Sequence, residues 1–152
     1  MQGTSTQAPV VRSLHRPGDR PARRALSWRC RLLRPYLRRE LPRWEAIYHH
    51  LVGNQPVERR WAGEPRRWSR GKLHGYEMEL DLARASERLS YFVGRFYELA
   101  TQLLLLDVLR PGDRVVDVGA NVGEITLLAS RLVGPGGRVD AFEPNPRCLQ
   151  RL

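Results

Sequence analysis

A short apolar segment ending in glycine, a helix-forming segment and a second apolar segment follow one another within residues 114–142. The first, Arg114 to Val118, is rich in β-branched residues, as expected for a strand buried on both faces. From Gly123 to Val133 the apolar residues recur at helical spacing, and the glycines and proline of 134–137 end the helix. A second strand follows, from Arg138 to Phe142. This order predicts one βαβ unit with a right-handed crossover.

Two residues of chemical interest follow directly after the two predicted strands. Gly119 comes after the first strand, and Glu143 comes after the second. In open parallel sheets, ligands bind beyond the carboxyl ends of the strands. The sequence therefore predicts a pocket for a nucleoside-containing cofactor at this edge of the sheet.

The spacing of the glycines distinguishes two classes of such cofactor. A dinucleotide site requires G-x-G-x-x-G, but the second and third glycine positions after Gly119 hold Asn121 and Glu124. The Cβ of Asn121 would crowd a pyrophosphate, and Glu124 would place negative charge where the anion binds. S-adenosylmethionine has no phosphate and carries a cationic sulfonium. It needs a tight backbone turn and an acidic partner for its ribose, which Gly119, Gly123 and Glu143 would supply.

The motif from Asp117 to Gly123 (Asp-Val-Gly-Ala-Asn-Val-Gly), together with Ala141 to Pro146, resembles the FkbM-type S-adenosylmethionine-dependent methyltransferases. The upstream segment, from Tyr91 through an apolar helix to Asp113, is similar to the stretch that precedes the glycine motif in that family. The likeness covers approximately Gly71 to Leu152. It implies an α/β, Rossmann-like class I methyltransferase fold, of which this sequence holds the part up to the second parallel strand.

The resemblance also implies which residues bind the cofactor. Glu143 would accept hydrogen bonds from both ribose hydroxyls, since a carboxylate at a strand end can chelate a cis-diol through two charge-assisted hydrogen bonds. Two structural alternatives stay open: the glycines could only shape a βα turn, and Asp117 could only cap it. The turn that would hold the methionine part of the cofactor consists of Asp117, Gly119, Ala120, Asn121 and Gly123.

By the same resemblance, the sheet of such an enzyme has further strands beyond the two that precede Leu152. We expect the chain to be an N-terminal part of the fold, with apolar sheet edges exposed. The acceptor would be a hydroxyl of a sugar, a glycan or a polyketide-like small molecule. The residues that bind it and catalyse transfer would lie beyond this sequence, so no catalytic residue is named.

Positive charge is concentrated in the first half of the chain. Residues 1–70 contain 16 arginines and 5 acidic residues, whereas residues 71–152 contain 10 basic and 11 acidic residues. Trp28 and Trp44 lie among these arginines, a pattern also found in RNA-binding segments. The chain has 25 arginines and one lysine, which a GC-rich coding sequence also explains. The alternatives to the enzyme are therefore an arginine-rich RNA-binding module and a truncated, inactive product.

Three parts are expected along the chain: a disordered basic tail at 1–25, an arginine-rich helical extension at 26–70, and the incomplete cofactor-binding domain at 71–152. Residues 41–51 have the apolar spacing of a helix, and residues 72–82 alternate like a strand or hairpin. An amphipathic helix on a membrane surface is disfavoured because a proline, Pro35, would interrupt it. The apolar side of that helix would consist of Trp28, Leu32, Leu33 and Leu37.

The remaining sequence features concern membrane insertion, disulfides and metal binding. The longest apolar run, Leu103 to Leu106, is far too short to span a bilayer, and no secretory signal is recognised at the start. Cys30 and Cys148 do not form a disulfide framework, and no histidine or cysteine spacing indicates a metal site. We expect a cytoplasmic location, whereas the oligomeric state is not readable from the sequence.

Overall fold

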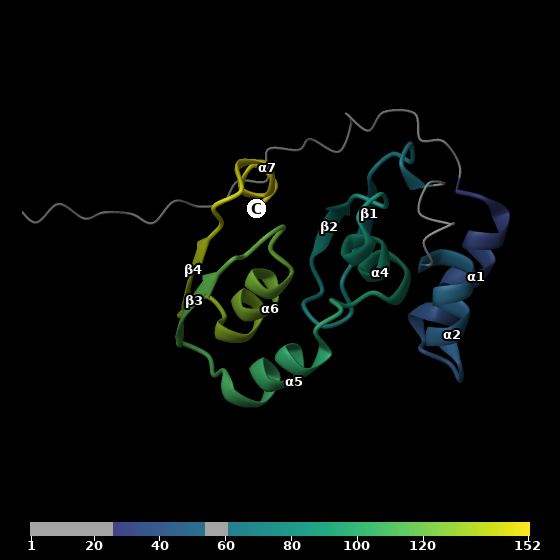
Figure 1. Ribbon diagram of the computed structural model, residues 1–152. Coiled ribbons are helices and arrows are strands. Elements are labelled where there is room, and N and C mark those ends of the chain that lie inside the picture. Colours follow the sequence, from purple (N-terminus) through teal and green to yellow (C-terminus); the bar gives the residue numbers. More distant parts are fainter. Residues whose placement is uncertain (1–25, 54–60) are drawn as a thin grey trace, which may run out of the picture.

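The computed structural model describes residues 26–53 and 61–152 (Figure 1), so the tail expected to be disordered lies outside the described residues. The protein is a mixed α/β structure with one antiparallel and one parallel pair of strands. In chain order the elements are α1 (Trp28–Arg38), α2 (Trp44–Tyr48), the π-helical turn η1 (His49–Gly53), β1 (Arg67–Arg70), β2 (Glu77–Leu80), α4 (Ala85–Val93), α5 (Leu99–Val108), β3 (Arg114–Val118), α6 (Glu124–Val133), β4 (Arg138–Phe142) and α7 (Pro146–Leu149).

Helix α1 runs through Pro35, so the predicted interruption is wrong. Proline removes one backbone hydrogen bond, but Cys30 and Leu37, one on each side of it, are both buried and anchor the helix to the core. The predicted apolar side does not form one surface either. Leu37 is fully buried, whereas Trp28 and Leu32 are 66% and 71% exposed.

The helix predicted for residues 41–51 is confirmed with shifted ends, since α2 begins at Trp44 and η1 extends the helical path to Gly53. Tyr48 and Val52, one helical turn apart, point into the core. Leu51, the last apolar residue of the predicted helix, is 47% exposed, so not every apolar residue of that pattern faces the core. The spacing identifies the helix but not the side that packs inward.

Strands β1 and β2 form a hairpin in which Arg67 lies opposite Leu80 and Arg70 lies opposite Glu77. The sequence predicted a strand or hairpin within 72–82, but the first strand ends before Gly71. The boundary expected after residue 70 therefore falls inside the hairpin. Strand β1 lacks apolar alternation because its inward side chains include Ser69, which is 6% exposed.

The core is built around Phe92 on α4, whose side chain is fully buried. Three aromatic rings meet it edge-on, with centroid distances of 6.4 Å to Tyr48, 5.8 Å to Trp61 and 5.2 Å to Tyr91. Edge-to-face pairs of this kind stabilise beyond the area that they bury. The cluster therefore joins the helices α1, α2 and η1 to the hairpin and α4.

The predicted βαβ unit is confirmed. Strands β3 and β4 pair in parallel, with Val118 opposite Phe142, and α6 connects them and covers one face (Figure 1). The other face is open, since Val116, Val118 and Phe142 are 63%, 81% and 58% exposed. The expectation that β3 is buried on both faces is wrong for the described structure, because no element covers this second face.

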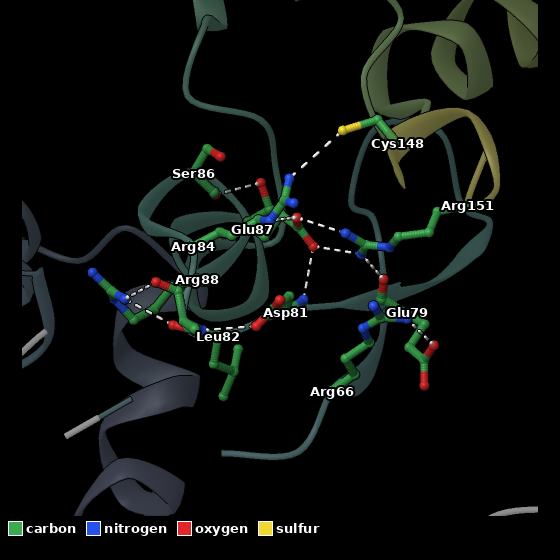
Figure 2. Close-up of polar contacts among 12 residues, drawn as sticks. Arg66, Glu79, Asp81, Leu82, Arg84, Ser86, Glu87, Arg88, Cys148 and Arg151 are labelled. Carbon is green, nitrogen blue, oxygen red and sulfur yellow. Dashed lines mark hydrogen bonds and ion pairs between the residues drawn. The ribbon is translucent and has the colours of Figure 1, made fainter. Parts of the chain in front are cut away.

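The chain after α7 returns to the hairpin through a buried ion pair, the Glu87–Arg151 clasp (Figure 2). Both guanidinium Nη atoms of Arg151 donate to the Glu87 carboxylate, at 2.9 and 2.6 Å, and Glu87 is 1% exposed. The backbone N–H of Asp81 donates to the same carboxylate at 2.7 Å, and Arg151 also donates to the carbonyl of Glu79 at 2.9 Å. These hydrogen bonds satisfy a charge that burial alone would make costly.

Candidate cofactor-binding site

The turn after β3 contains three residues with left-handed backbone conformation. Gly119 has φ 85°, Asn121 has φ 52° and Gly123 has φ 90°. Glycine adopts this conformation without strain, and asparagine is among the side-chain residues that tolerate it best. The sequence pattern Gly-x-Asn-x-Gly is therefore explained by the backbone that it must form.

Hydrogen bonds fasten this turn to the end of β4. The N–H groups of Gly119 and Ala120 both donate to the carbonyl of Phe142, at 2.8 and 3.1 Å. Gly123 donates to the carbonyl of Ala120 at 2.8 Å. A Cβ added to Gly119 would meet no atom within 4 Å, so the space beside this glycine is open.

Glu143 lies at the same edge as the turn, as predicted from the sequence. One oxygen of its carboxylate accepts from the N–H of Asn121 at 2.7 Å, and the other accepts from the N–H of Asn145 at 2.7 Å. Two backbone donors thus hold a half-buried carboxylate beside the turn. A carboxylate has about four lone-pair directions, so capacity for further donors remains.

Asp117 lies on β3, and its side chain contacts α6. It accepts a hydrogen bond from the hydroxyl of Thr126 on α6 at 2.5 Å. This contact ties the strand to the covering helix. The structure thus brings five of the six predicted residues together at the edge of the sheet, namely Gly119, Ala120, Asn121, Gly123 and Glu143, while the Asp117 carboxylate faces α6.

Glu124, the first residue of α6, is 8% exposed and lines a small cavity with Ser90 and Gln102. The pKa of Glu124 is raised to about 7, mainly by burial; a hydrogen bond from Ser90 opposes the shift, and the nearby charge of Glu87 adds to it. No local pattern in the sequence indicates that Glu124 is buried, because the residues facing it come from α4 and α5. With such a pKa, Glu124 is only partly ionised near neutral pH, so its charge disfavours a dinucleotide less than the sequence predicts. The missing glycines disfavour that ligand as before.

The backbone of the turn supplies a separate argument about ligand charge. Four of the five N–H groups in residues 119–123 already donate within the protein. A pyrophosphate needs free N–H donors at such a turn, whereas an ammonium group needs oxygen acceptors. The turn therefore favours a ligand whose nearest group is cationic.

Comparison with known proteins gives one short likeness. The chain is 60% identical over 38 residues to the 31-O-demethyl-FK506 methyltransferase FkbM of Streptomyces tacrolimicus, a match that covers 25% of this chain and 14% of that enzyme. No family model matches the chain, and no solved structure matches it. The likeness supports a relation to a segment of a methyltransferase.

Two features are absent from the described part of the chain. No helix within residues 26–53 and 61–152 is long and apolar enough to cross a membrane. Within the same residues, no group of three or more histidine, cysteine, aspartate or glutamate side chains is placed to hold a metal ion.

Proposed function

We propose that this chain provides the S-adenosylmethionine-binding part of a methyltransferase with a Rossmann-like class I fold. The observation that carries the proposal is the juxtaposition of a left-handed turn after β3 with the Glu143 carboxylate after β4. Parallel pairing of the two strands places these features side by side. The short likeness to a methyltransferase agrees with this assignment.

The residues fit the cofactor on two counts. The open space beside Gly119 allows the methionine part to approach the backbone, and the carbonyl groups of the turn would accept hydrogen bonds from its ammonium group. Glu143 would bind the ribose hydroxyls with the lone pairs that its backbone donors leave unused. When bound, S-adenosylmethionine supplies an electrophilic methyl group.

Ala120 and Asn121 would act through the backbone. Ala120 is 5% exposed, and its small side chain packs against the protein. The N–H of Asn121 holds the Glu143 carboxylate in position. Asp117 would act indirectly, since its bond to Thr126 orients β3 against α6. We propose a hydroxyl-bearing small molecule or glycan as the acceptor, by the resemblance described above.

Calorimetric titration of the chain with S-adenosylmethionine tests the proposal. Glu143→Ala and Gly119→Val should each weaken binding at least about tenfold, equivalent to ~1.4 kcal/mol. Glu143→Gln, which keeps one acceptor oxygen, should fall between the alanine variant and the wild type. Asp140→Ala is the matched control, because it removes a carboxylate from β4, the strand before Glu143. That carboxylate pairs with Arg138.

Far-UV circular dichroism of each variant separates lost binding from lost structure. This matters for Gly119→Val, since a side chain at φ 85° strains the backbone. Equal affinity in wild type, Glu143→Ala and Gly119→Val would rule out this site. Tighter binding of NADH than of S-adenosylmethionine would replace it with a dinucleotide site.

A further inference from the structure

A groove along α1, at the end of the molecule away from β3 and β4 (Figure 1), is lined by cationic side chains. We call it the α1 groove. Its volume of about 830 Å³ lies within the usual range for small-molecule sites, and no carboxylate lines it. Its six cationic residues are Arg31, Arg34, Arg38, Arg39, Arg67 and Lys72.

Only part of this charge is neutralised by the protein. Arg67 pairs with Glu64 at 3.0 Å, and Lys72 pairs with Glu40. The other four arginines of the groove, all on or next to α1, pair with no carboxylate among the residues that the structure describes. The groove therefore holds a concentrated positive charge.

Two of these four guanidinium groups are held in place by uncharged partners. Arg34 donates to the carbonyl of Tyr91 at 3.1 Å and to the hydroxyl of Ser69 at 2.9 Å, and it lies 4.1 Å from the centre of the Tyr91 ring. Arg38 donates through Nη2 to the carbonyl of Arg70 at 2.6 Å. A site with fixed donors loses less entropy when an anion binds.

Arg38 shows that the charge is uncompensated. Its Nη1 atom is buried against Gly94 and has no hydrogen-bond partner within the described chain. Burial and then the charge of Arg34 lower the pKa of Arg38. An anion in the groove would offset both effects, since opposite charge favours the ionised guanidinium.

The surroundings favour a compact anion over single-stranded RNA. RNA binding of that kind needs exposed aromatic rings beside the cations. Tyr91 is 7% exposed and lies under Arg34, and the Trp44 ring lies under Arg95 at 5.6 Å. Trp28 is exposed but lines a different, mainly apolar groove with Leu32 and Ile47.

We propose that the α1 groove is a binding site for a compact phosphate-bearing anion, separate from the cofactor turn. Guanidinium groups match phosphate oxygens through paired hydrogen bonds, so the arginines of this cluster suit such a ligand. The exposed side chains of Arg31 and Arg39 would reach the ligand from solvent. Arg34 and Arg38, which the protein holds in place, would bind it at the base of the groove.

The test is titration of the chain with inorganic pyrophosphate at constant ionic strength. The wild type should bind saturably with Kd below about 1 mM. Arg31→Gln combined with Arg39→Gln should raise that Kd about tenfold or more without unfolding, since both side chains are exposed. The matched control is Arg29→Gln, which removes a charge from the same helix outside the groove and should change Kd less than about twofold.

Three results would overturn the proposal: no saturable binding of pyrophosphate by the wild type, equal weakening in Arg29→Gln, or tight binding of a short RNA that pyrophosphate does not displace. The last result would assign the surface to nucleic acid. Affinity for S-adenosylmethionine should be unchanged in the Arg31→Gln, Arg39→Gln variant, so failure here is distinguishable from failure of the cofactor site.

Discussion

The region before Gly94 and the βαβ unit differ in how they are stabilised. Every member of the main core cluster except Val122 lies between Leu26 and Phe92. In the βαβ unit, by contrast, one sheet face is open and Val118 is 81% exposed. The βαβ unit, which carries the recognisable glycine motif, therefore contributes little to the main core cluster. A motif can be recognised in the sequence even where few side chains are buried.

The difference follows from what each region requires. The turn of the βαβ unit is specified by a few left-handed residues and by hydrogen bonds to the adjacent strand. The first region has no comparable local signature and depends on aromatic rings brought together from separate helices. Three measurements of the free energy of unfolding test this difference between the two regions.

The largest effect is expected at Phe92. Phe92→Ala removes a fully buried ring that three other aromatic rings contact, so the free energy of unfolding should fall by about 3–5 kcal/mol. Val118→Ala, on the open sheet face, should change it by no more than about 0.5 kcal/mol. Urea denaturation of both variants gives the values. Similar losses in the two variants would show that the open face is covered in solution.

The clasp should have the next largest effect. Arg151→Met leaves the buried Glu87 carboxylate without its cation and should lower the free energy of unfolding by about 3 kcal/mol. Arg138→Met is the control, because it breaks a solvent-exposed pair with Asp140 and should change the free energy of unfolding far less. Equal losses for the two variants in urea denaturation would show that the Glu87–Arg151 pair is not buried as described. Glu87→Gln combined with Arg151→Met should recover part of the loss.

The smallest effect is a pH dependence that arises at Glu124. Its pKa is about 7 in the folded protein and 4.5 in the reference state, so the folded state keeps a proton that the unfolded chain has released between these pH values. This contribution to stability is present below pH 4.5 and is lost as the pH rises through 7, and about 2–3 kcal/mol of it is lost between pH 5 and pH 8.

Glu124→Gln mimics the protonated carboxyl and should remove this pH dependence. In urea denaturation the variant should therefore gain stability relative to the wild type from pH 5 to pH 8. Comparison with the variant is needed because His74, in the same cavity, acts in the opposite direction. Burial lowers the pKa of His74, so its contribution is fully present above pH 6.5 and is lost as the pH falls from there through the lowered pKa of the folded state. A constant difference across the pH range would mean that Glu124 is not buried as described.

Much of the βαβ unit could be predicted from the sequence because its signals are local. A β-branched strand, a glycine turn and a glycine-rich helix end lie within 30 residues of one another. The positions of Gly119 and Glu143 then followed from the rule that ligands bind at the carboxyl ends of parallel strands. The direction of the Asp117 side chain did not follow, since its partner Thr126 lies on the covering helix.

The first region was harder to predict because its contacts join distant residues. Strand β1 carries arginines and a buried serine, so its pattern does not indicate a strand. Pro35 suggested a helix end, but burial of Leu37 outweighs the missing hydrogen bond. The α1 groove also needed the structure, because a run of arginines does not reveal which of them lack a carboxylate partner.

The clasp described above has a consequence for the order of folding. Arg151 and Glu87 are 64 positions apart, so their pairing closes a long loop and requires the βαβ unit to be in place. Contacts between such distant residues generally form late, after local helices and hairpins. During synthesis, α4 would emerge from the ribosome well before Arg151, and the Glu87 carboxylate would stay hydrated until its partner is available. Burial of the Glu87 charge would therefore be a late step, in which the βαβ unit becomes joined to the region before Gly94.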